Sequence, residues 1–143
     1  MCCISLMKIS QKLEYACRAL TQLAKHHDGR TLTRLDDLAQ REDISRSFLL
    51  QILSDLRRAG LIDSCRGAAG GYLLARPAAA ISLRQVVDSV DPSLLQNSVT
   101  PAGESGSAIQ SVWEKISLDL CEALEQVTLE NICAGQSSPM FFI

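Results

Sequence analysis

The sequence predicts a mainly α-helical fold with one small β-hairpin. Two observations support this class. Apolar residues recur every three or four positions in several segments, and one short stretch switches to β-compatible residues around a glycine-rich turn. The 143 residues, 47% of them hydrophobic, suffice for one cored domain or a small domain plus an appendage. No apolar run approaches the roughly 18 residues of a membrane span. No signal peptide is recognised, so we expect a cytoplasmic protein without membrane contact.

Two helices are predicted first along the chain. Residues 8–27 carry apolar side chains at helical spacing, and Gly29 is the expected stop. A short helix is expected at 34–41, with Thr33 as its N-cap and Asp36 and Asp37 at its positive N-terminal end.

The third helix is predicted at residues 46–59. Ser45 is the expected N-cap, and Gly60 is expected to close the C-terminus. Its inward face is predicted to consist of Leu49, Ile52, Leu53 and Leu56. The other surfaces of the helix are left with Arg46, Ser47, Leu50 and Gln51.

A hairpin and two further helices complete the prediction. Strands at 61–65 and 72–75 flank the glycine-rich loop 66–71, and Ser82 caps a short helix at 83–90. A long loop is expected at 91–107, followed by an amphipathic helix at about 108–127. Thr128 is the expected cap of a final turn. The stripe on the long helix consists of Ile109, Val112, Trp113, Ile116, Leu120, Leu124 and Val127.

Charge is divided unevenly along the chain. The net charge is −2, but residues 1–77 hold 12 Lys or Arg against 8 Asp or Glu, a balance of +4. Residues 78–143 hold 2 against 8, a balance of −6. A near-neutral average therefore does not exclude nucleic-acid binding by the N-terminal half.

Three short helices followed by a hairpin predict a winged helix-turn-helix, and its third helix is basic. Such a helix fits the major groove of DNA, and the hairpin, or wing, can place an arginine in the minor groove. The alternative is a helix-turn-helix that contacts only proteins. Arg46, Arg57, Arg58 and Arg66 together favour double-stranded DNA.

Several stretches resemble the Rrf2 family of bacterial transcription regulators. They are residues 7–10, 40–45, 48–53, 56–62, 66–77 and 81–83, with further matches at 112–113 and 128–129. The resemblance implies a homodimer on a partly palindromic operator. It also implies three parts: a winged helix-turn-helix DNA-binding domain at 7–90, a flexible loop at 91–107 and a dimerisation helix at 108–134.

The resemblance also implies which residues contact DNA. The recognition helix supplies base and phosphate contacts, the wing arginine enters the minor groove, and the start of the first helix touches phosphate. Arg57 and Arg58 of the third helix and the glycines of the wing loop are added to this set. The predicted DNA-binding residues are Lys8, Ser10, Lys12, Ser45, Arg46, Ser47, Phe48, Gln51, Arg57, Arg58, Arg66, Gly67, Gly70, Gly71 and Tyr72. Gln51 suits adenine, and Arg46 suits guanine or phosphate.

Two departures from the family pattern concern specificity and the wing. Leu50 stands where some members carry a glutamate that tunes operator choice. Ala68 and Ala69 replace the usual proline and first glycine of the wing tip.

Many members of the family bind an iron–sulfur cluster through three cysteines in the loop after the fourth helix. Here that loop, 91–107, contains no cysteine. The six cysteines are Cys2, Cys3, Cys17, Cys65, Cys121 and Cys133, without C-x-x-C spacing. Glu14, where some relatives place an acidic ligand, is expected to be exposed or to form a salt bridge in the first helix instead. We therefore expect no metal and no cofactor.

Two alternatives concern how the regulator is controlled. One is a regulatory protein partner, and the other is a thiol switch at Cys65, whose neighbour Arg66 would lower its pKa. An enzyme is disfavoured, because no nucleophile accompanies the His26-His27-Asp28 run, which is better explained as a solvated helix end. No catalytic residue is predicted.

Overall fold

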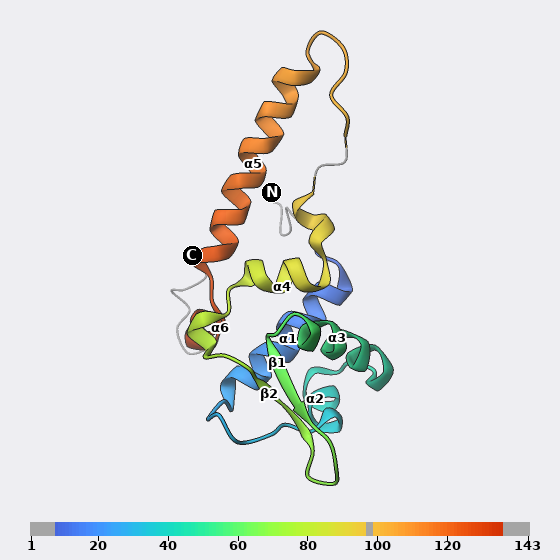
Figure 1. Cartoon of the computed structure of the whole chain (residues 1–143), viewed down its shortest axis with the longest axis vertical. Coiled ribbons are helices and arrows are strands. Elements are labelled where there is room, and N and C mark those ends of the chain that lie inside the picture. Colours follow the sequence, from blue (N-terminus) through green and yellow to red (C-terminus); the bar gives the residue numbers. More distant parts are fainter. Residues whose placement is uncertain (1–7, 97–98, 136–143) are drawn as a thin grey trace, which may run out of the picture.

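The computed structural model describes residues 8–96 and 99–135, and Figure 1 shows their arrangement. Its helices and strands are α1 (Gln11–Lys25), α2 (Leu35–Glu42), α3 (Arg46–Arg58), β1 (Ile62–Cys65), β2 (Gly71–Leu74), α4 (Leu83–Val90), α5 (Gly106–Gln126) and α6 (Leu129–Gly135). Two short 3-10 helices lie at Ala78–Ala80 and Pro92–Leu95. The mainly helical class with one hairpin is confirmed.

Serine caps define the starts of three helices. The Ser10 hydroxyl accepts a hydrogen bond from the N–H of Leu13, and the Ser45 hydroxyl accepts one from the N–H of Phe48 at 3.4 Å. Ser82 and Gln85 form a reciprocal capping box at the start of α4. The predicted caps Ser45 and Ser82 are confirmed.

Two predicted helix ends are wrong. Thr33 does not cap α2, because its backbone N–H and C=O both pair with Tyr72 at 2.8 Å, and Arg34 occupies the N-cap position without a side-chain cap bond. The first helix ends at Lys25 and not near Gly29, which lies in the following loop with a φ of 82°.

Asp28 organises the loop after α1. Its carboxylate accepts hydrogen bonds from the Thr31 hydroxyl and from the N–H groups of Thr31 and Arg30. These donors, the Thr31 hydroxyl first, lower the pKa of Asp28 from 3.8 to about 2. The bonds stabilise the folded chain above the ordinary pKa, and this contribution is lost as the pH falls through the lowered value.

The core lies among α1, α2, α3, α4, α6 and the hairpin and is built from aliphatic side chains. Leu20, Leu38, Ile62 and Val86 are fully buried. The predicted inward face of α3 is confirmed, since Leu49, Ile52, Leu53 and Leu56 are all 0% exposed. Each such side chain contributes about 1.5–3 kcal/mol to folding. In the N-terminal half of α3, the face opposite these residues is directed to solvent.

The long helix α5 projects away from this body (Figure 1). None of its 21 residues is buried, and Ile109, Val112, Trp113 and Ile116 remain 50–54% exposed. Further along the helix, Leu124 packs against the core, and Arg84 in α4 donates to Glu125 at 3.2 Å. The predicted stripe exists, and its N-terminal part is left about half-exposed by the described residues of one chain.

After α5 the chain returns to the body. Thr128 pairs with Ser82 in an isolated bridge, and its hydroxyl accepts from the N–H of Asn131, which confirms the predicted cap of the last helix. No helix among residues 8–96 and 99–135 has the length and apolar character to cross a membrane.

Candidate nucleic-acid interface

The N-terminal half of α3 presents a polar surface. Arg46, Ser47, Leu50 and Gln51 are exposed on consecutive turns, opposite the buried face of the helix. The Ser45 hydroxyl is engaged as the cap, so the remaining free N–H groups of the first turn carry the positive end of the helix dipole. This arrangement suits a phosphate at the start of α3 and base edges along its exposed face.

Phe48 has a supporting position in this helix. Its ring is half-buried and meets the Tyr15 ring edge-on, with centroids 5.4 Å apart. The Arg18 guanidinium lies 4.9 Å from the same Tyr15 ring. Phe48 therefore holds the start of α3 against α1, and its predicted contact with DNA stays a prediction.

The wing is an antiparallel hairpin in which Ile62 pairs with Leu74 and Cys65 with Gly71. Gly67, with a φ of 112°, opens a turn that closes with a hydrogen bond from Gly70 N–H to Gly67 C=O at 3.0 Å. Arg66 is exposed at its start.

Gly71 serves internal packing more than DNA approach. It is buried, and a Cβ there would lie 2.5 Å from the Thr33 carbonyl oxygen. Tyr72 is likewise tied to Thr33 through its backbone. The wing is thus docked on the segment that precedes α2.

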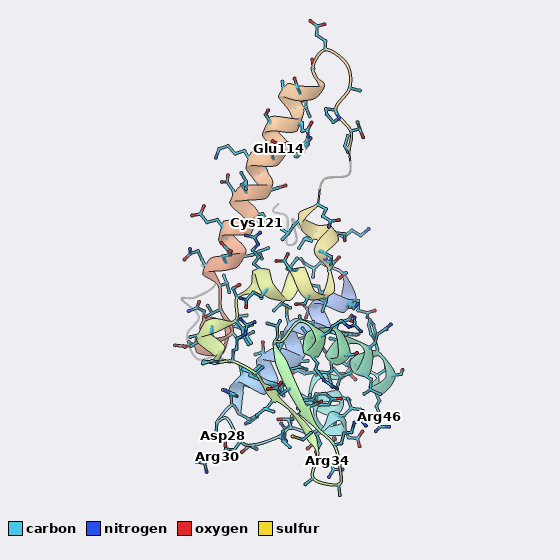
Figure 2. All side chains as sticks on the ribbon, in the orientation of Figure 1. Asp28, Arg30, Arg34, Arg46, Glu114 and Cys121 are labelled. Carbon is cyan, nitrogen blue, oxygen red and sulfur yellow. The ribbon has the colours of Figure 1, made fainter. Side chains whose placement is uncertain are left out.

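A hollow of about 260 Å³ separates the wing from the starts of α2 and α3. Its lining includes Arg34, Asp36, Arg46, Cys65, Arg66 and Tyr72. Figure 2 shows Arg34 and Arg46 at the end of the molecule that carries the wing. The structure therefore brings the predicted residues Arg46 and Arg66 to one site.

Arg34 and Asp36 belong to this site although neither was among the predicted DNA-binding residues. Arg34 donates from Nη1 to the Ala68 carbonyl at 3.1 Å. Arg46 Nε lies 3.0 Å from Asp36 Oδ1, and both side chains are about two-thirds exposed. No sequence spacing signals either contact, because both join separate elements.

We expect Asp36→Asn to strengthen DNA binding about threefold. It removes a negative charge from the surface and frees Arg46 from an exposed ion pair that is worth little to folding. Asp37→Asn, with the same charge change on the neighbouring residue, is the control. Fluorescence-anisotropy titrations measure the affinity for DNA. If both substitutions raise it equally, the release of Arg46 from its ion pair contributes nothing to DNA affinity.

The predicted contacts at the start of α1 are partly engaged within the protein. Lys12 Nζ lies 2.6 Å from Asp55 Oδ2, and Arg58 Nη1 lies 3.3 Å from the other oxygen of that carboxylate. Lys8 and Arg57 are exposed. The Lys12–Asp55 pair braces α1 on α3, whereas Arg57 and Arg58 are both exposed at the C-terminal end of the recognition helix.

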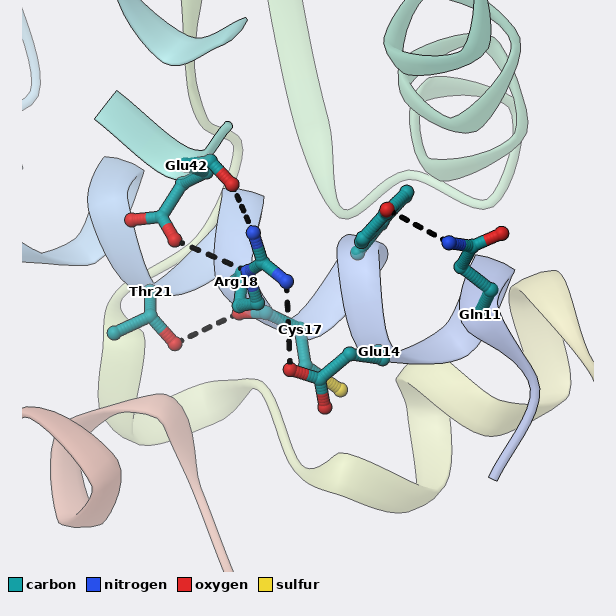
Figure 3. Close-up of polar contacts among 7 residues, drawn as sticks. Gln11, Glu14, Cys17, Arg18, Thr21 and Glu42 are labelled. Atoms are coloured by element: carbon teal, nitrogen blue, oxygen red, sulfur yellow. Dashed lines mark hydrogen bonds and ion pairs between the residues drawn. The ribbon is translucent and has the colours of Figure 1, made fainter. Parts of the chain in front are cut away.

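A second bracing network joins α1 to α2 (Figure 3). The Arg18 guanidinium binds the Glu42 carboxylate at 3.3 Å and also donates to the Glu42 backbone carbonyl. Glu14 lies 3.8 Å from the same guanidinium, in the salt bridge that was expected. The helix-turn-helix is therefore held to the first helix by charge as well as by the core.

The cysteines of the described chain lie in different environments. Burial, together with the nearby Glu14 charge, raises the pKa of Cys17 from 9.0 to about 12. Burial also raises the pKa of Cys133, whereas Cys65 is exposed. Cys2 and Cys3 lie outside the described residues. Within residues 8–96 and 99–135, no three His, Cys, Asp or Glu side chains are grouped to hold a metal ion.

We expect iodoacetamide to alkylate Cys65 well before Cys17 in the native chain. The thiolate is the reactive form, and Cys17 is both buried and held as the thiol. Peptide mass spectrometry over a time course measures the order. As a control, the two cysteines should be alkylated at similar rates in denaturant. Equal alkylation rates of Cys65 and Cys17 in the native chain would contradict the structure.

The His26-His27-Asp28 run does not assemble a catalytic group in this structure. The Asp28 carboxylate is occupied by residues 30 and 31. The fold and the surface between wing and recognition helix instead define a winged helix-turn-helix protein that binds DNA to regulate transcription.

Comparison with known proteins makes the assignment more specific. Residues 9–135 match the family model described as "Rrf2: Iron-dependent Transcriptional regulator". The chain is 36% identical to the HTH-type transcriptional regulator IscR of Cereibacter sphaeroides, over 93% of this chain and 91% of that protein. It is 33% identical to CymR of Bacillus subtilis, over 96% and 100%. The chain belongs to the Rrf2 family.

Solved structures agree with this assignment. The structure of CymR, the global cysteine regulator of B. subtilis, superimposes with a TM-score of 0.78 at 33% identity, covering 90% of this chain and 98% of that one. T. potens IscR gives a TM-score of 0.73 at 32% identity, with coverage of 92% and 89%. The predicted winged helix-turn-helix is confirmed.

Among the described residues, no donor set is brought together for the iron that the family description names. A cluster needs several thiolates close together in space. The loop 91–107 has no cysteine, and the described cysteines lie on separate elements: α1, β1, α5 and α6. No step of the mechanism is therefore assigned to iron.

Proposed function

We propose that two copies of this chain bind a partly palindromic operator, each through α3 and its wing. The observation that carries the proposal is the hollow where Arg46 of the recognition helix and Arg66 of the wing face one site. With Arg46 in the major groove and Arg66 in the minor groove, the two arginines would fix the register of the protein on the duplex and its sequence preference.

The residue roles follow from the surface. Arg46, Ser47 and Gln51 are exposed and suited to base edges, and Arg66 is suited to a narrow minor groove. Arg57, Arg58 and Lys8 suit phosphates. Ser10, Ser45, Phe48, Gly71 and Tyr72 act by holding these elements in place, and Lys12 does so through Asp55.

The exposed stripe of α5 supports the dimer. Four apolar side chains at positions i, i+3, i+4 and i+7 form one face that is half-exposed in a single chain. A second copy covers it with an identical stripe, as a two-fold interface requires. In this scheme residues 7–90 bind DNA in the cytoplasm, 91–107 connect the two parts, and 108–134 dimerise.

The test is selection of binding sites from random-sequence duplexes by the full chain. We expect an enriched motif with two inverted half-sites and a binding constant that falls steeply with salt, because bound phosphates release counterions. A salt-insensitive interaction or the absence of any enriched motif overturns the proposal.

We further propose that binding requires no iron–sulfur cluster. Anaerobically purified chain is expected to hold no stoichiometric iron or sulfide, and to bind the selected operator equally with and without a chelator. Stoichiometric iron together with chelator-sensitive binding would contradict this prediction.

A thiol switch is the second candidate for control. Cys65 is exposed and lines the same hollow as Arg66, so bulk or charge added there would obstruct DNA. Peroxide oxidises a thiolate to sulfenic acid and is itself reduced to water. If Cys65→Ser and the wild type lose operator binding equally on peroxide treatment, this mode of control is excluded. The regulatory protein partner expected from the resemblance stays a prediction.

A further inference from the structure

The wing tip is tethered to the body of the protein by Arg34. The Nη1 atom of Arg34 donates a hydrogen bond to the backbone carbonyl of Ala68, which lies 34 residues further along the chain. Figure 2 shows Arg34 beside the lower end of the hairpin. Arg34 is exposed and sits at the N-cap of α2, so its backbone is held by the helix-turn-helix while its side chain reaches the wing.

Within the hairpin, the tip of the wing is held by a single turn hydrogen bond. Ala68 and Ala69 are the two central residues of the turn that Gly70 N–H and Gly67 C=O close at 3.0 Å, and both are exposed. Ala68 occupies the position at which proline presets φ in such turns, and alanine leaves φ free. Two exposed methyl groups supply no packing either. The Arg34 bond is therefore a tether from outside the hairpin.

The root of the wing is held by the residue next to Arg34. Thr33 exchanges two backbone hydrogen bonds with Tyr72, both 2.8 Å long. Gly71 lies so close to the Thr33 carbonyl that no side chain fits between them. Residues 33 and 34 thus fix the hairpin at Tyr72 and at Ala68, and Arg66 lies two residues before Ala68, at the end of the opposite arm.

We propose that Arg34 is a positioning residue for DNA binding, which fixes the wing tip so that Arg66 is presented at a constant angle to the recognition helix. This inference rests on the proposed function. Its physical basis is preorganisation: a tip that is already ordered loses less conformational entropy when it enters a groove.

A direct contact between Arg34 and phosphate is the competing role, since the guanidinium is exposed on the same surface. The two roles predict different couplings. A positioning residue acts through Arg66, so its loss has little effect once Arg66 is absent. A phosphate contact acts independently, so the losses multiply.

The experiment is a double-mutant cycle of Arg34→Ala and Arg66→Ala on the selected operator. We expect Arg34→Ala to weaken binding about fivefold in the wild-type background and less than about twofold in Arg66→Ala. Arg41→Ala, which removes the same charge from the other end of α2, is the control and is expected to show no such coupling. Thermal unfolding of each variant checks that the fold is kept.

A rescue variant separates the roles in a second way. Ala68→Pro fixes φ at the tip, and within the described residues the Ala68 N–H donates no hydrogen bond that proline would remove. In the Ala68→Pro background, Arg34→Ala is expected to cost less than about twofold in affinity.

The outcomes distinguish this inference from the proposed function. Multiplicative losses, or no rescue by Ala68→Pro, overturn the role of Arg34 and leave the regulator intact. Failure of the wild-type chain to bind any duplex overturns the proposed function itself. Amide hydrogen exchange at Gly70 in the free protein then still tests the tether, because Arg34→Ala should speed exchange at the tip and unchanged exchange would show that no tether exists.

Discussion

Val112→Asp is expected to convert the dimer into a folded monomer and to lower operator affinity on the order of 100-fold, because each half-site is then bound without its linked neighbour. Val112 lies in the centre of the exposed stripe and is 53% exposed in the single chain. An aspartate there is hydrated in the monomer but would be buried against apolar side chains in the dimer. Sedimentation velocity at micromolar concentration measures the change.

Leu118→Asp is the matched control for this prediction. Leu118 is also apolar and 70% exposed, but it lies nine residues after Ile109, about half a turn out of phase with the stripe. It is expected to leave both dimer and affinity unchanged, and circular dichroism should show both variants folded. A Val112→Asp chain that sediments as a dimer would place the seam elsewhere on the molecule.

Arg66→Ala is expected to weaken operator binding by about 1–3 kcal/mol, and most strongly where the operator has a narrow A·T-rich minor groove. Arg66 is exposed at the start of the wing turn, on the same hollow as Arg46. Its charge meets the enhanced negative potential of such a groove. Titrations against operators that differ only in the A·T content beneath the wing measure the effect.

Arg57→Ala provides the comparison. Arg57 is exposed in the last turn of α3, away from the wing hollow, and suits a phosphate. Its loss is expected to weaken all duplexes alike and to reduce the slope of log affinity against log salt by about one. If Arg66→Ala also acts on all sequences equally, its role is a phosphate contact and the wing does not enter a groove.

Much of the fold could be predicted from sequence because its signals are local. The buried face of α3 follows from helical spacing, and the caps Ser45 and Ser82 follow from a hydroxyl placed directly before an apolar repeat. Thr33 was misassigned as a cap for the same reason. It precedes a helix, but its backbone is paired with a strand 39 residues away, which no local rule detects.

The candidate site was predictable only in part. Arg46 and Arg66 stand out through their positions in a basic helix and a glycine-rich wing. Arg34 and Asp36 do not, because their partners, Ala68 and Arg46, come from other elements. Phe48 was predicted to contact DNA, and only the structure shows that its half-buried ring packs edge-on against Tyr15.

The family, the order of helices and hairpin, and the division into a basic and an acidic half could all be predicted from the sequence, because each depends on composition, spacing and local motifs. Tertiary structure alone decided which charges are neutralised within the protein, as in the pairs Lys12–Asp55 and Arg46–Asp36, and which remain free. It also decided that the wing is held at both root and tip by residues 33 and 34. Ion pairs and tethers of this kind depend on distances between segments far apart in the chain, and such distances exist only once the core has packed.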